Sequence, residues 1–117
     1  MNELANLFVW RREDVVVVAL TGELDVSNAE RLEQAIVLEV GNDAAGLVLD
    51  LAGLEFMDSS GVHLLFHLAD RLTMTGRRLA VIAPEGGSPR RVLELSGPET
   101  RGWIHGGEDA ALAAVLT

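Results

Sequence analysis

The sequence predicts an α/β protein, in which a mixed β-sheet packs against α-helices. Apolar runs of strand length, rich in β-branched residues, recur along the chain, and segments with apolar residues at helical spacing separate most of them. The first two strand-like runs follow each other directly, which is typical of a hairpin. A hairpin followed by alternating helices and strands gives the order β-β-α-β-α-β-α-β-α, and we expect residues 1–117 to form it as one domain.

Residues 7–13 and 15–24 form the predicted hairpin. Both stretches carry β-branched and aromatic residues, and Glu13 and Asp14 lie between them as a tight turn. Residues 15–20 are apolar without alternation. We therefore expect the second strand to be central in the sheet and covered on both faces.

The first helix is expected to begin at residues 27–30, Ser-Asn-Ala-Glu, which match a capping box. In this motif the Ser27 side chain accepts the amide of Glu30, and the Glu30 side chain reaches back to the helix start. Apolar residues then recur at helical spacing: Ala29, Leu32, Ile36 and Val40. Gly41 is expected to end the helix.

The middle of the chain predicts a strand and a second helix. Residues 46–51 are a short apolar run, which we expect to end in a turn at Ala52 and Gly53. From Val62 onward an apolar stripe at helical spacing indicates a helix, and Gly76 closes it.

The last third of the chain predicts two strands and two helices. Residues 79–83 indicate a buried strand, and residues 88–98 a helix with Ser88 as its N-cap and a proline in its first turn. Residues 101–105 indicate a short edge strand. Residues 108–116 indicate a final helix, whose first acidic residues favour the helix N-terminus.

Composition and charge exclude several classes of protein. There is no cysteine, so disulfides, thiolate metal sites and thiol nucleophiles are excluded. The formal net charge is −9 and the nine basic residues, all arginine, are spread along the chain, which argues against direct nucleic-acid binding and suits a basic protein partner. The apolar runs are far shorter than the roughly 20 residues that cross a bilayer. We expect a cytoplasmic protein that does not enter a membrane and has no cofactor.

The stretch Phe-Met-Asp-Ser-Ser-Gly at residues 56–61 has three interpretations. Asp58 and the two serines are residue types that cap helices by accepting backbone amides. Alternatively, one serine could be a nucleophile or could carry a covalent phosphate. A strand-to-helix turn places these hydroxyls at the carboxyl end of a strand, where sites in α/β folds tend to lie, so location alone does not decide between the three.

A nucleophilic serine has the least support among these interpretations. Such a serine needs a base, an orienting acid and an oxyanion pocket, and residues 57–61 do not fit the G-x-S-x-G form of the hydrolase elbow. His63 and His67 follow on the same helix, whose direction carries them away from its N-terminus. A hydrolase acting through Ser59 or Ser60 therefore lacks an identifiable triad.

A phosphate is compatible with the physics of this position. At a helix N-terminus it meets free backbone amides and the positive end of the helix dipole. It adds about −1.5 to −2 charges beside Asp58 in a molecule that is already acidic. Such a group would change a binding surface and leave the core intact.

Two stretches resemble a known family. Residues 19–34, ALTGELDVSNAERLEQ, and residues 47–65, LVLDLAGLEFMDSSGVHLL, resemble the STAS domain, and most closely its single-domain anti-sigma factor antagonists. The separation of the two motifs and the predicted element order also match. The resemblance covers nearly the whole chain, so it implies that residues 1–117 are one STAS domain.

The resemblance implies a partner-switching function. In the family, the serine directly after the aspartate is phosphorylated by an anti-sigma factor that is an ATP-using serine kinase, and here that serine is Ser59. The unphosphorylated form would bind the anti-sigma factor and free a sigma factor, phosphorylation would break the complex, and a serine phosphatase would restore it. The resemblance also suggests that the loop of Asp25 lies beside Ser59. The expected partner-binding residues are Asp25, Asp58, Ser60, Gly61 and His63.

The sequence departs from the family pattern just after the serines. Relatives often continue Asp-Ser-Ser-Gly-Leu-Gly, whereas Val62 and His63 follow Gly61 here. His63 in place of a small residue changes the expected docking surface. It also shares a helix face with His67 and Asp70 at a spacing that suits metal ligands, but no fourth ligand is identifiable and we expect solvated or partner-facing side chains and no metal.

Two alternatives stay open beside the anti-sigma factor antagonist. A STAS domain could instead be a scaffold subunit of a signalling complex or of a lipid-transport ATPase. The third class is a small serine hydrolase, for which the sequence offers a hydroxyl but no triad.

Overall fold

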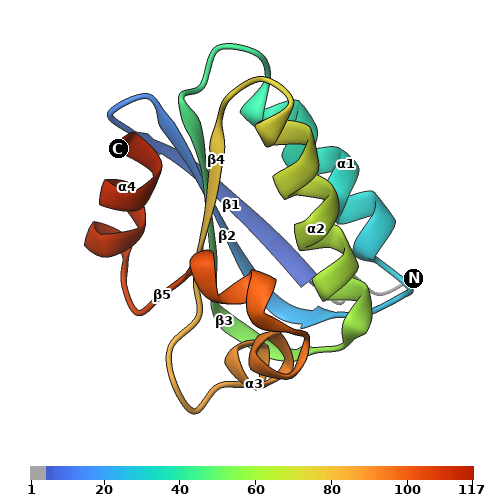
Figure 1. Ribbon diagram of the computed structural model, residues 1–117. Helices are drawn as coiled ribbons and strands as arrows, with labels where there is room; N and C mark the ends of the chain where they lie inside the picture. The colour runs from blue at the N-terminus through green and yellow to red at the C-terminus, as the bar shows by residue number, and fades with distance from the viewer. Residues whose placement is uncertain (1–4) are drawn as a thin grey trace.

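The computed structural model describes residues 5–117, which form a five-stranded sheet with α-helices on both faces (Figure 1). The strands, in their order across the sheet, are β1 (Ala5–Arg12), β2 (Val15–Leu24), β3 (Gly46–Met57), β4 (Arg78–Ile82) and β5 (Ile104–His105). The helices are α1 (Ala29–Val40), α2 (Ser59–Thr73), α3 (Ser88–Leu95) and α4 (Glu108–Leu116), and a short 3₁₀ helix, η1 (Pro98–Gly102), precedes β5. The fold class and element order are confirmed, with η1 as an element that the sequence did not predict.

The sheet is mixed, as expected for a hairpin followed by crossovers. β1 is antiparallel to β2, and the pairs β2–β3, β3–β4 and β4–β5 are parallel. Glu13 and Asp14 join β1 to β2 with φ angles of 51° and 70°. Two consecutive positive φ angles are typical of the tight turn whose twist matches that of the flanking strands, so the predicted hairpin is confirmed.

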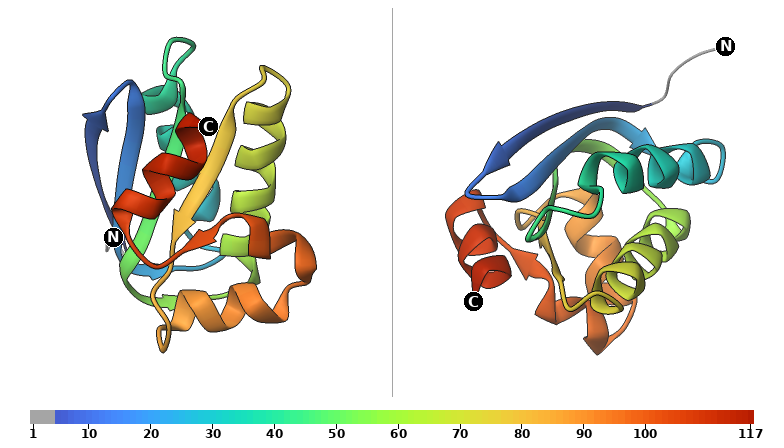
Figure 2. Two further views of the ribbon diagram at one scale, coloured as in Figure 1. Left: turned by 60° about the vertical axis from the view of Figure 1, so that its left-hand side comes forward. Right: turned by 90° about the horizontal axis from the view of Figure 1, so that it is seen from above.

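The two faces of the sheet are covered unequally. The larger core lies between the sheet and α1, α2 and α3, whereas α4 covers the opposite face (Figure 2). Val16 and Val18 of β2 lie in the larger core, and Val15 and Val17 contribute to the core under α4. Residues of both faces are fully buried, so the prediction of a central strand covered on both sides is confirmed.

β3 is longer than the sequence indicated. The predicted strand at 46–51 continues to Met57, so the expected turn at Ala52 and Gly53 is wrong. The pairing of β3 with β2 shifts register at two points, and at each of them β3 carries one extra residue. Gly53 fits at the first irregularity because a Cβ there would lie 2.8 Å from Cγ2 of Thr21. Gly53 therefore lets β3 continue through a register shift and does not form the predicted turn.

The starts of α1 and α2 also differ from the predictions. α1 begins at Ala29 with Asn28 at the N-cap, so the predicted capping box of Ser27 and Glu30 is wrong. The Ser27 hydroxyl instead donates to Asp25 Oδ1 at 2.6 Å, because the chain turns before the helix starts. α2 begins at Ser59, three residues before the first residue of the predicted stripe.

The start of α3 is one residue earlier than predicted, and the remaining C-terminal elements follow the expected order. Ser88 is the first helical residue of α3 and not its N-cap, since its Oγ accepts the amide of Met57 at 3.3 Å. The predicted edge strand at 101–105 is confined to Ile104–His105, whereas the predicted last helix has the expected bounds. Among the helices of residues 5–117, none has the length and apolar content of a membrane span.

Candidate functional site

The candidate site lies where β2 and β3 end next to each other. Leu24 and Met57 are paired at the ends of these parallel strands, and the amide of Asp58 donates to the carbonyl of Leu24 at 3.3 Å. Asp25 and Asp58 are the next residues, and each begins the connection to a helix. The loop of Asp25 and the start of α2 are therefore side by side, in line with the suggestion of the resemblance.

The first residues of α2 have separate structural roles. Asp58 is the N-cap, and its Oδ1 accepts the amide of Ser60 at 2.8 Å. Ser60 is half-buried, whereas Ser59 is exposed and its hydroxyl has no hydrogen bond within residues 5–117. Asp58 therefore caps the helix, and the neighbouring Ser59 is left exposed.

Gly61 fixes how the first turn of α2 packs. It is buried, and a Cβ at this position would overlap the Met57 side chain and lie 3.0 Å from Cδ2 of Leu24. A residue without a side chain is therefore needed for α2 to approach the ends of β2 and β3. Burial leaves Gly61 little surface for a partner, so its visible contribution is to hold Ser59 in position.

The loop of Asp25 is ordered by a buried asparagine. Asn28 is 2% exposed, its Oδ1 accepts the amide of Asp25 at 3.1 Å, and its Nδ2 donates to the carbonyl of Glu23 at 2.9 Å. Asp25 Oδ1 also accepts the Ser27 amide at 2.9 Å. The sequence predicted Ser27 as the N-cap of α1 and no role for Asn28. The available signal was a second capping residue immediately before the helix.

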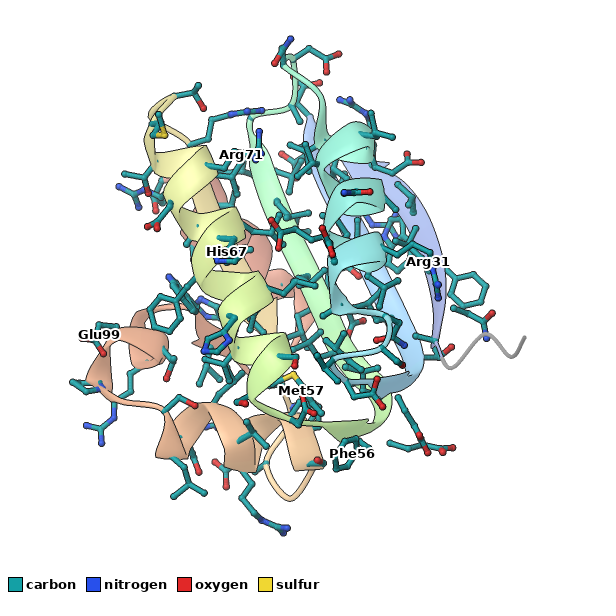
Figure 3. The ribbon with its side chains drawn as sticks, turned by 90° about the vertical axis from the view of Figure 1, so that its right-hand side faces the viewer. Arg31, Phe56, Met57, His67, Arg71 and Glu99 are labelled. Carbon is teal, nitrogen blue, oxygen red and sulfur yellow. The ribbon has the colours of Figure 1, made fainter. Side chains whose placement is uncertain are left out.

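Two exposed apolar side chains flank the site. Val26, in the loop of Asp25, is 81% exposed, and Phe56, next to the end of β3, is 45% exposed. Figure 3 shows Phe56 beside Met57 at the end of the sheet where α2 begins. Exposed apolar groups among polar neighbours often mark contact surfaces. Neither was predicted from the sequence, although Val26 between the polar residues of a turn is a visible signal.

His63, His67 and Asp70, the residues of α2 with metal-ligand spacing, do not come together as a ligand group. His63 is exposed one turn after Ser59, and His67 Nδ1 lies 3.0 Å from Oε1 of Glu33 on α1. Asp70 is exposed further along the helix. Among residues 5–117, no three His, Asp or Glu side chains are grouped so that they could hold a metal ion.

The fold and this site define a small mixed α/β domain that exposes a serine hydroxyl at the carboxyl edge of its sheet. The STAS domain family model matches residues 9–109. The chain belongs to the STAS domain family.

Similar proteins have been described as anti-sigma factor antagonists. The anti-sigma-F factor antagonist RsfB of Mycobacterium tuberculosis is 32% identical over 83 residues, which cover 71% of this chain and 66% of that relative, slightly under two thirds of its length. A crystal structure of an anti-sigma factor antagonist from Mycobacterium paratuberculosis has a TM-score of 0.85 and 32% identity, over 97% of this chain and 95% of that one. The phosphorylated form of the Bacillus cell fate determinant SpoIIAA has a TM-score of 0.70 and 25% identity, over 92% and 97% of the two chains.

Proposed function

We propose that this protein is an anti-sigma factor antagonist that changes partners through phosphorylation of Ser59. The unphosphorylated form binds an anti-sigma factor that is also an ATP-using serine kinase, and this binding frees a sigma factor. Phosphate on Ser59 breaks the complex, and a serine phosphatase restores it. Residues 1–117 act as one STAS domain in the cytoplasm, as a binding module and not as an enzyme.

The observation that carries this proposal is the exposed hydroxyl of Ser59. Ser59 is the first residue of α2 and is accessible to a kinase, whereas the neighbouring Ser60 is half-buried with its amide bonded to Asp58. The positive end of the helix dipole offsets part of the phosphate charge. The modified serine is therefore compatible with an unchanged fold.

The surroundings of Ser59 suit a protein partner. Val26 and Phe56 offer exposed apolar area, and Asp25 and Asp58 offer carboxylates for a basic partner residue. Ser60, Gly61 and His63 complete the proposed contact region, with Gly61 acting through its packing. The region combines apolar area with negative charge.

Phosphorylation adds negative charge at the centre of this region. The group brings about −1.5 to −2 charges to a contact that already contains carboxylates. A charge left unpaired in an interface costs about 2–5 kcal/mol, which is roughly a 30-fold to several-thousand-fold loss of affinity. Dissociation then requires no conformational change within the domain.

The similar proteins support this proposal. RsfB and the Mycobacterium paratuberculosis protein are both described as anti-sigma factor antagonists, each at 32% identity. SpoIIAA has been solved in a phosphorylated form on the same fold. A domain with this fold can therefore carry a phosphate.

The test is phosphorylation by the cognate anti-sigma factor kinase with ATP, with the product mapped by mass spectrometry. We expect one phosphate on Ser59 in the wild type and in Ser60→Ala, and none in Ser59→Ala. The two substitutions remove the same atom at adjacent positions, so each controls for the other. Phosphate on Ser60, or on neither serine, would count against the proposal.

A further inference from the structure

A continuous groove follows the contact between α1 and α2. It consists of a hollow of about 490 Å³ that begins at Ser60 and His63, a middle hollow of about 300 Å³, and a hollow of about 340 Å³ at the other end. Arg71 lines all three, and Glu33 also lines the first two. Figure 3 faces this side of the molecule, with His67 and Arg71 on α2 beside α1. The hollows are therefore parts of one groove.

The groove has the length and apolar lining that suit a helix. Leu64 and Leu68 of α2 and Val37 of α1 line it, and Leu38 at its rim is 81% exposed. From Ser60 to Thr73, α2 rises about 20 Å at 1.5 Å per residue, and the groove continues to Thr75 just beyond the helix, so a helix of about 15 residues would span it. Amphipathic helices bind in grooves of this kind through apolar residues on one face.

The charges of the groove are separated along its length. Glu30 and Glu33 line only the hollows toward Ser60, where Glu33 Oε1 also lies 3.0 Å from His67 Nδ1. Arg77 lines only the far hollow, and Arg71 lies between the two ends. Arg77 donates to the carbonyls of Gly41 and Ala44, at 3.2 and 3.1 Å, which keeps its charge in place. Arg71 is exposed and has no hydrogen bond or ion pair within the described chain. A complementary ligand therefore has positive charge at the Ser60 end and negative charge toward Arg71 and Arg77.

We propose that this groove binds an amphipathic helix of the protein partner, with basic residues near Glu30 and Glu33 and acidic residues near Arg71. The identity of that partner as the anti-sigma factor rests on the proposed function, whereas the chemistry of the helix follows from the groove itself. The groove contact also differs from the Ser59 contact in its response to phosphate. Negative charge on Ser59 extends the acidic end of the groove, so it does not weaken the binding of a basic helix end.

The test uses two synthetic helical peptides of about 15 residues with identical composition and an identical leucine stripe. In one, lysines occupy one end and glutamates the other; in the second, lysines and glutamates alternate. We expect the segregated peptide to bind at least about fivefold more tightly, and to shift the NMR amide signals of groove residues. Equal affinities, signal shifts confined to other surfaces, or no binding of either peptide would overturn the proposal.

Two matched protein variants test whether the preference for the segregated peptide depends on the groove. Arg71→Glu is expected to abolish the preference for the segregated peptide, and Arg101→Glu, the same charge change at an exposed position on η1, is expected to keep it. Loss of the preference in both variants would contradict a groove-specific effect. If the protein alone sediments as a dimer that Arg71→Glu dissociates, the occupant is a second copy and the proposal fails.

The outcome is separable from that of the proposed function, because the peptide test contains no anti-sigma factor. Ser59→Asp is expected to bind the segregated peptide at least as tightly as the wild type does. A clear loss of peptide binding in Ser59→Asp would overturn the independence of the two contacts. If neither peptide binds but Ser59 is phosphorylated by the kinase, only the groove proposal is overturned. If the segregated peptide binds but Ser59 is not phosphorylated, only the partner-switching function is overturned.

Discussion

At the scale of single residues, the stretch from Asp58 to Gly61 combines a glycine that is packed in the core with a serine whose hydroxyl is exposed. Asp58 satisfies an amide of the first turn, which frees Ser59 from any capping role. Gly61, two residues further on, lies against Met57 and Leu24. A helix start that contacts the core so closely holds its first residue in a defined place. The backbone of Ser59 is therefore held in place, while its hydroxyl is exposed and has no hydrogen bond within residues 5–117.

Gly61→Ala is expected to lower the free energy of unfolding by about 1–2 kcal/mol. Overpacking a buried site costs about 1–3 kcal/mol, and the better helix propensity of alanine returns up to about 1 kcal/mol. The added methyl group overlaps the Met57 side chain, which is itself 1% exposed and has little room to move. Urea denaturation measures the change.

Met57→Ala provides the control for this overlap. In that background the methyl group of Gly61→Ala occupies space that Met57 vacates, so the added substitution is expected to cost close to nothing. If Gly61→Ala cost the same in both backgrounds, the contact with Met57 would not be the reason for the glycine.

At the scale of elements, the connection from β2 to α1 depends on Asn28. Asn28→Ala removes a donor and an acceptor from a buried position and leaves the Glu23 carbonyl and the Asp25 amide without these partners. We expect a loss of about 1–3 kcal/mol in the free energy of unfolding. We also expect faster hydrogen exchange at the amides of Asp25 and Asn28.

Ser27→Ala is the matched control in the same loop. Its hydroxyl donates to Asp25 from an exposed position, so its removal is expected to change stability by no more than about 0.5 kcal/mol. An equal effect of the two substitutions would mean that Asn28 does not order the loop.

The elements also show which parts of the fold the sequence can predict. The hairpin, the apolar stripe of α2 and the end of α1 at Gly41 follow from local patterns, because helix period and positive φ are properties of short segments. The predicted end of α2 at Gly76 is late, since the helix ends at Thr73 and Gly76 lies in the turn that follows. The continuation of β3 past Gly53 does not follow, since it depends on pairing with β2, far away in the sequence. A glycine in a bulge and a glycine in a turn look the same locally.

The candidate site was predictable to a similar extent. Resemblance to the STAS domain indicated Ser59, and the parallel pairing of β2 with β3 accounts for the nearby loop of Asp25. The role of Asn28 and the exposure of Phe56 depend on contacts between segments that the sequence does not bring together. The groove between α1 and α2 likewise requires the spatial packing of two helices.

At the scale of the whole molecule, the fold separates its stability from its proposed regulation. The two cores lie on opposite faces of the sheet, and the exposed Ser59 belongs to neither. The net charge is already −9, so one further negative charge changes the global field little. A charge at Ser59 therefore acts mainly on whatever contacts this edge of the sheet.

Ser59→Asp is accordingly expected to weaken binding of the anti-sigma factor by at least about 30-fold, because the carboxylate lies unpaired in the interface. The free energy of unfolding is expected to change by less than about 0.5 kcal/mol, since the residue is exposed and an acid is favourable at a helix N-terminus. Calorimetry measures the affinity and thermal denaturation the stability. Ala110→Asp is the matched control, because it adds the same charge at an exposed position near the start of α4, on the opposite face of the sheet. Equal affinity of Ser59→Asp and the wild type, or an equal loss in Ala110→Asp, would show that the charge at Ser59 does not act through the docked surface.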